Sequence, residues 1–130
     1  MGFVCGCASV CCGRLCVSSR DWIHWVRDIL EAIGDIQEYT QGLDPDTFAS
    51  NKRTLHAVVY CLIVIGEAER HIPEDVKARH PDAPWHSMRG MRNFLVHEYP
   101  WVSPSVIWET ATKNLPPLVE PLQRMIEAEA

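Results

Sequence analysis

The sequence lacks any uncharged apolar run of about 18 residues, the length at which a segment becomes a candidate membrane-spanning helix. It also lacks the alternation of apolar and polar residues that is typical of half-buried strands. Internal repeats and low-complexity linkers are missing as well. These absences argue against membrane-spanning, β-rich and repeat architectures. A chain of 130 residues is then expected to form one helical domain.

A basic excess is also missing. The chain has 12 Lys and Arg against 17 Asp and Glu, which gives a formal net charge of −5. This balance argues against a surface that binds nucleic acid everywhere. The acidic residues, however, gather early in the chain, whereas arginines and histidines gather between residues 70 and 97. A local basic groove therefore remains compatible with the sequence.

Cysteine is scarce outside the N-terminal end, where five of the six cysteines lie between residues 5 and 16. These five form no pair of CxxC motifs and have no histidine among them, unlike typical zinc sites. We therefore predict a Cys-rich, non-functional extension over residues 1–18 and the folded domain over residues 19–130. The extension has no basic start ahead of an apolar stretch, so it is a poor signal peptide and we expect a cytoplasmic protein. No histidines show metal-ligand spacing, and neither a metal nor a cofactor is expected.

Apolar periodicity predicts long helices in the first half of the chain. Residues 22, 26, 29, 33 and 36 form one apolar stripe, on a helix that starts near residue 18 and ends near Gly42. Asp44-Pro45 is typical of a helix start, and the next helix is expected to continue to about Arg70. Its segment 55–66 is apolar nearly all round, which predicts the central helix. Gly66 costs this helix about 1 kcal/mol relative to Ala, which indicates a close helix crossing.

Prolines mark the later boundaries. Residues 73–80 are expected to form a short helix, and residues 85–98 a third main helix that ends before a proline. Ser103-Pro104 predicts the start of the last helix, which Pro116-Pro117 must kink or break. The sequence therefore predicts an all-α, up-and-down bundle of four main helices plus a short extra helix.

Three polar side chains with distinct chemistry fall within eight residues at the end of the third main helix: Arg92, His97 and Tyr99. An arginine can hold a phosphate through two parallel hydrogen bonds. A histidine can take or give a proton near neutral pH. RNA cleavage without a metal needs a base, an acid and a cation, which these residue types supply. The alternative is an ordinary helix end with a surface arginine, a capping histidine and a surface tyrosine.

Arginine, four residues, histidine, any residue and tyrosine is the signature of HEPN-domain proteins, and residues 92–99 match it. The surroundings resemble the HepT-like toxins of toxin–antitoxin pairs over roughly residues 20–125. The matching landmarks are Ile65-Gly66-Glu67-Ala68, Pro84-Trp85, Gly90-Met91-Arg92-Asn93, Trp108 and Leu115-Pro116. The resemblance implies a metal-independent endoribonuclease that acts on RNA. It also implies a cognate minimal nucleotidyltransferase, the antitoxin, which adenylylates Tyr99 and so silences the toxin.

The spacing of Arg92 and His97 poses a geometric problem. Residues five apart on a regular helix point about 140° away from each other, so one protomer would aim the two side chains poorly at one phosphate. Either the helix distorts, or a second protomer supplies the missing half. HEPN proteins resembling this chain pair as two-fold dimers around one shared cleft, and we favour a homodimer.

Neighbouring residues are candidates for supporting roles. Arg89 lies one turn before Arg92 and would extend a cationic, RNA-binding strip, or it is a solvated surface arginine. Asn93 could hydrogen-bond substrate or simply face solvent. Glu67 on the central helix could orient Arg92, or it forms an ordinary surface ion pair. A non-catalytic module of the same fold, which binds a nucleotide or a partner nucleotidyltransferase, is the alternative function. The intact motif favours the enzyme, and the acidic net charge slightly favours the module.

Overall fold

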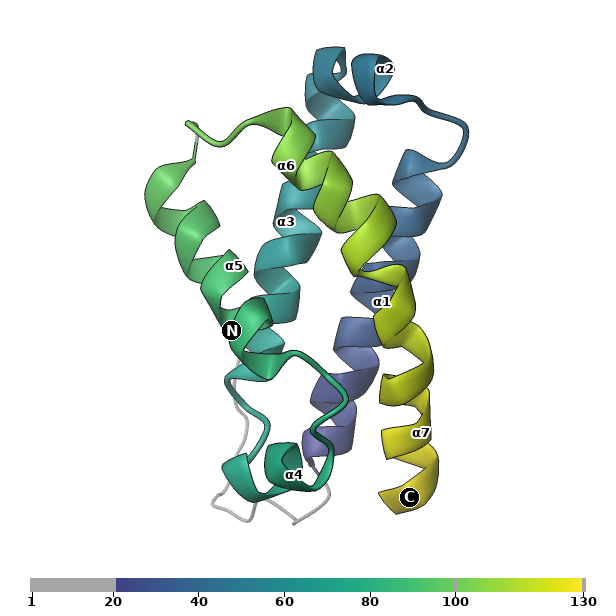
Figure 1. Cartoon of the computed structure of the whole chain (residues 1–130), viewed down its shortest axis with the longest axis vertical. Coiled ribbons are helices and arrows are strands. Elements are labelled where there is room, and N and C mark those ends of the chain that lie inside the picture. The colour runs from purple at the N-terminus through teal and green to yellow at the C-terminus, as the bar shows by residue number, and fades with distance from the viewer. Residues whose placement is uncertain (1–20, 100, 130) are drawn as a thin grey trace, which may run out of the picture.

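The computed structural model describes residues 21–99 and 101–129, which form helices joined by short turns, with no strand among them. The prediction of an all-α bundle is therefore confirmed, whereas the expected extension over residues 1–18 lies outside the described residues. The α-helices, shown in Figure 1, are α1 (Trp22–Thr40), α2 (Pro45–Ser50), α3 (Lys52–Glu69), α4 (Glu74–Arg79), α5 (Trp85–Glu98), α6 (Pro104–Glu109) and α7 (Val119–Glu129).

Helix α3 lies at the centre of the bundle, with α1 packed on one side and α5 on the other (Figure 1). The predicted apolar stripe of α1 is confirmed, because Val26, Ile29, Ile33 and Ile36 are all fully buried. α1 ends at a turn in which Gly42 has a φ of 79°, a left-handed conformation that glycine adopts at little cost. The central position of α3 also matches the sequence expectation, since its neighbours cover it on two sides.

The expectation of one helix from Asp44 to Arg70 is wrong. Asn51 leaves helical geometry, with φ −103° and ψ 92°, and separates α2 from α3. Its side chain accepts a hydrogen bond from the backbone N–H of Thr54 at 3.1 Å, so Asn51 caps the start of α3. Asparagine favours such caps because its short side chain can satisfy an N–H group that has no partner within the helix. The cap therefore starts a new helix where one continuous helix was expected.

The predicted break in the last helix is confirmed. Ser103 caps α6, and Pro116-Pro117 separates it from α7. The chain between α6 and α7 first widens into a π-helical turn over Thr110–Asn114, in which the N–H of Leu115 donates to the carbonyl of Thr110 at 3.0 Å. It then tightens into a 3-10 turn over Pro116–Leu118. A π-helical turn inserts one extra residue per turn, which shifts the face that the following residues present.

Helix α5, which carries the sequence motif, lies at one edge of the bundle (Figure 1). Among the described elements, only α3 packs extensively against it. The position of the motif therefore depends on the contact between α3 and α5. Within the described ranges, no helix is both long enough and apolar enough to span a bilayer.

Candidate active site

The contact between α3 and α5 is closest at Gly66. A Cβ atom built on Gly66 would lie 2.1 Å from Cβ and 2.8 Å from Cγ of Arg92, and 3.0 Å from the carbonyl oxygen of Met88. Real Cβ atoms essentially never approach other atoms this closely. The missing side chain of Gly66 therefore leaves room for the aliphatic stem of Arg92. The predicted helix crossing is confirmed, and it lies at the arginine of the motif.

The guanidinium of Arg92 is held at both terminal nitrogens. Nη2 lies 2.8 Å from Oε1 of Glu67, and Nη1 donates to Oδ1 of Asn93 at 3.1 Å. Nε is buried and has no acceptor among the described residues. Each terminal nitrogen carries two hydrogens, so both keep at least one N–H for a ligand. With 26% of its side chain exposed, Arg92 is oriented by its neighbours and still reachable from solvent.

Glu67 is a carboxylate shared by two arginines. Its Oε1 also accepts a hydrogen bond from Nη1 of Arg70 at 3.1 Å. Partial burial acts to raise the pKa of Glu67, but the hydrogen bonds and positive charges of Arg70 and Arg92 outweigh it and lower the pKa. Glu67 is therefore firmly ionised near neutral pH. The contact with Arg92 is the one that the sequence suggested for Glu67.

Arg89 lies one turn before Arg92 but is held by a different carboxylate. Its Nε and Nη2 donate to the two oxygens of Glu69 at 3.1 and 3.0 Å. Glu69 is fully buried and also accepts a hydrogen bond from the buried Lys77. The hydrogen bonds and charge of Glu69 raise the pKa of Arg89 above its ordinary value. This pairing links α5 to α3 and α4. RNA binding by Arg89 stays a prediction, and it would use the N–H groups of Arg89 that Glu69 does not bind.

His97 is exposed on a different flank of α5 from Arg92. α5 is α-helical through Glu98, and the N–H of Tyr99 still donates to the carbonyl of Leu95 at 3.1 Å. The helix is therefore regular across the motif, and no distortion brings Arg92 and His97 together. By helical geometry the two side chains diverge by about 140°. Within one protomer the structure brings together Arg92, Asn93 and Glu67, and it leaves His97 apart from them.

Tyr99 leaves the helix, with φ −68° and ψ 133°, and it is half-buried against the core. Its ring meets the exposed His56 of α3 edge-on, with ring centroids 5.8 Å apart and planes at 75°. The sequence interpretation missed His56 as a neighbour of the motif. No local pattern could have revealed it, because the contact depends on the antiparallel register of α3 and α5.

The outer flank formed by α3 and α5 carries exposed apolar side chains. Tyr60 is 69% exposed and Val96 is 45% exposed. Tyr60 lies one turn after His56 on α3, and Glu67 lies two turns further along the same flank. α3 is therefore central, as expected, but its apolar segment 55–66 is not covered on every side, because this flank is exposed.

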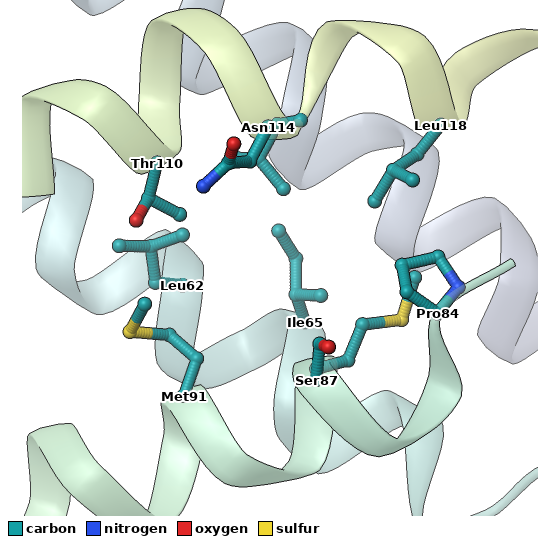
Figure 2. Close-up of a pocket in the computed structure, with 10 residues that line it drawn as sticks. Leu62, Ile65, Pro84, Ser87, Met91, Thr110, Asn114 and Leu118 are labelled. Carbon is teal, nitrogen blue, oxygen red and sulfur yellow. The ribbon is translucent and has the colours of Figure 1, made fainter.

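An apolar cavity of about 100 Å³ lies between α5 and the segment that follows α6 (Figure 2). Leu62 and Ile65 of α3 form its floor, Met91 of α5 and Leu118 line opposite walls, and the amide of Asn114 reaches into it. None of its lining residues is charged, so this cavity does not contain the chemistry of the motif. Among residues 21–99 and 101–129, there is no group of three or more His, Cys, Asp or Glu side chains that could hold a metal ion.

Comparisons with known proteins agree on one family. The model of the HepT-like ribonuclease family matches residues 29–125. The chain is 37% identical to a candidate RNase of Methanocaldococcus jannaschii, over 83% of this chain and 89% of that protein. It is 39% identical to a Thermococcus cleftensis protein named "Probable ribonuclease HepT", over 76% of this chain and 90% of that protein. No solved structure matches the chain significantly.

Proposed function

Because the chain belongs to the HepT-like ribonuclease family, we propose that it is a metal-independent endoribonuclease in which Arg92 and His97 are catalytic. The observation that carries this proposal is the way in which the neighbouring residues position the Arg92 side chain. Gly66 makes room for its stem, Glu67 and Asn93 hold its terminal nitrogens, and part of the guanidinium faces solvent. An arginine oriented in this way is prepared to bind a phosphate without losing much rotamer freedom.

In the proposed reaction the 2′-hydroxyl of the substrate attacks the adjacent phosphorus, and the bond to the 5′-oxygen breaks. One histidine accepts the proton from the 2′-hydroxyl, and another donates a proton to the leaving 5′-oxygen. Arg92 neutralises the charge that grows on the phosphoryl oxygens. The products are then a 2′,3′-cyclic phosphate and a 5′-hydroxyl. His97 is the residue that we assign to proton transfer.

Two copies of the chain would complete this site. Arg92 and His97 diverge on a regular α5, so one protomer does not direct both side chains at one phosphate. A two-fold axis beside α5 would instead set two arginines and two histidines, one of each from each copy, around one shared cleft. The exposed Tyr60 and Val96 on the same outer flank favour such a homodimer, because burial of large apolar side chains stabilises association. Sedimentation at micromolar concentration should show a dimer, and a 14.8 kDa monomer alone would contradict this proposal.

The test of the activity is incubation of the purified protein with total RNA in the presence of EDTA. Wild-type protein should cleave, whereas His97→Ala and Arg92→Ala should each lose activity, by about 10²–10⁴-fold for the loss of proton transfer. His86→Ala is the matched control, since His86 is another exposed histidine of α5. Full activity of either motif variant, or products with 3′-hydroxyl ends, would contradict the mechanism.

We further propose that the protein is the toxin of a toxin–antitoxin pair and that a cognate minimal nucleotidyltransferase adenylylates Tyr99. AMP on Tyr99, two residues beyond His97, would place a negative phosphate and a bulky nucleoside beside the site and so repel RNA. Mass spectrometry of the co-expressed pair should find AMP on Tyr99, with loss of RNA binding and of cleavage. Tyr99→Phe should escape this control. Silenced activity with unmodified Tyr99 would instead mean masking within a complex.

The alternative is a non-catalytic module that binds a nucleotide or a partner nucleotidyltransferase through the same face. The acidic net charge of −5 is the observation in its favour. The two functions make different predictions for the EDTA assay. The module should bind its ligand and leave RNA intact, with wild type and His97→Ala indistinguishable.

A further inference from the structure

Arg70 stands beside Arg92 because both arginines use the same carboxylate. Nη2 of Arg92 and Nη1 of Arg70 lie 2.8 and 3.1 Å from the same Oε1 atom of Glu67. Arg70 is the C-cap residue directly after α3, and its side chain is 55% exposed. The two guanidinium groups therefore bracket one oxygen atom, and both are reachable from solvent.

The charges of this cluster do not cancel. Two arginines and one ionised glutamate leave a net charge of +1. A phosphodiester of RNA carries a charge of −1, so one such group would neutralise the cluster. Each guanidinium has five N–H donors, and the contacts with Glu67 and Asn93 use only some of them. The remaining donors of two neighbouring planar cations suit the oxygens of a phosphodiester.

We propose that Arg70 is a second phosphate-binding side chain of the site, which acts together with Arg92 on one phosphodiester of single-stranded RNA. This inference rests on the proposed function, because it takes Arg92 as a phosphate ligand. Glu67 holds the two cations close together, which their mutual repulsion would otherwise oppose. The ordinary alternative is a surface ion pair three residues apart on one helix, which adds little to stability and nothing to RNA binding.

Arg124 provides a matched control. Nη1 of Arg124 lies 2.7 Å from Oε1 of Glu120, which precedes it by four residues on α7. The side chain of Arg124 is 54% exposed. Arg70→Gln and Arg124→Gln therefore change the net charge equally and break exposed ion pairs, which for Arg124 include a longer one with Asp82 at 3.6 Å. Only the first variant alters the cluster at Arg92.

The experiment measures binding of a labelled single-stranded RNA whose 2′-hydroxyls are methylated, so that it cannot be cleaved, over a range of salt concentrations. Arg70→Gln should weaken binding about tenfold, the lower end for a hydrogen bond to a charged group. It should also reduce the slope of log affinity against log salt by about 0.7, the value for one lost contact to a single strand. Arg124→Gln should change neither quantity appreciably, and Arg70→Lys should keep the slope.

A double-mutant cycle with Glu67→Gln separates direct contact from an effect through Glu67. If Arg70 binds phosphate, its loss should still weaken binding about tenfold when Glu67 is already Gln. Two results would overturn the inference: no loss of RNA binding in the Glu67→Gln background, or equal effects of Arg70→Gln and Arg124→Gln. If Arg92→Gln still weakens binding in that case, the proposed function stands and only the inference fails. Failure of wild type to bind RNA, with Arg92→Gln unchanged from it, would instead overturn the proposed function together with the inference.

Discussion

Substitution of Gly66 by Ala should separate α3 from α5 at the motif. The added Cβ would lie 2.1 Å from Cβ of Arg92, whereas ordinary contacts are 3.4–4 Å, so the helices must move apart by about 1.5 Å. Neither atom is the flexible end of a side chain, and the backbone must therefore shift. Overpacking of this kind costs about 1–3 kcal/mol, which exceeds the gain of about 1 kcal/mol that Ala brings to a helix interior.

Gly34→Ala is the control for this prediction. Gly34 lies in α1, and nothing stands within 4 Å of the position that its Cβ would take. Gly34→Ala should therefore raise the free energy of unfolding by about 1 kcal/mol, whereas Gly66→Ala should lower it by up to about 2 kcal/mol. Thermal unfolding followed by circular dichroism measures both changes.

Activity provides a second measurement on the same pair of variants. A displacement of about 1 Å at a catalytic group can cost about 100-fold in rate, so Gly66→Ala should lose most RNA cleavage even where it remains folded. Gly34→Ala should keep full activity. If Gly66→Ala is as stable and as active as Gly34→Ala, the close approach does not position Arg92, and the reasoning is refuted.

Other predictions concern buried and paired ionisable groups. Glu69→Ala should lower the free energy of unfolding by roughly 3–5 kcal/mol, because it removes the buried carboxylate beside the buried ammonium of Lys77 and leaves only the exposed Glu74 as its partner; a loss below about 1 kcal/mol in urea unfolding would contradict this. The pKa of Glu67 is lowered, so its stabilisation is present above the ordinary glutamate pKa and lost as the pH falls through the folded value. Stability profiles of wild type and Glu67→Gln should therefore converge in acid, and parallel profiles would count against the pairing. Burial and the charge of Asp35 raise the pKa of Cys61 to about 11, so iodoacetamide at about pH 8 should label Cys61 only after unfolding, as peptide mass spectrometry can check.

Local features of the sequence predicted the parts of the fold that depend on local physics. The apolar stripe of α1, the bounds of α5 and the break at Pro116-Pro117 follow from periodicity and proline geometry, and the structure confirms them. Gly66 was predicted to mark a helix crossing because a glycine within a helix needs a reason. The contact between Glu67 and Arg92 was anticipated as one of two alternatives, because Glu67 lies beside Gly66 on the central helix.

Other features depend on the register between helices, which no local pattern encodes. Glu69 joins Arg89 to Lys77 across three helices, and this arrangement changes the environment expected for Arg89. His56 meets Tyr99 only because α3 and α5 run antiparallel at one particular offset. The cap at Asn51 is instead a local feature that was overlooked: residues 50–54 are all polar, and asparagine favours helix starts.

The most direct test of the account is a subunit-mixing experiment between wild-type protein and His97→Ala. If one cleft needs a histidine from each copy, only dimers of two wild-type subunits are active. After equal amounts exchange subunits, such dimers make up about a quarter of the total, so RNA cleavage should fall to about half of its value before exchange. Native mass spectrometry verifies that mixed dimers have formed. Cleavage that stays unchanged while mixed dimers form would show that each protomer works alone, and it would contradict the shared site.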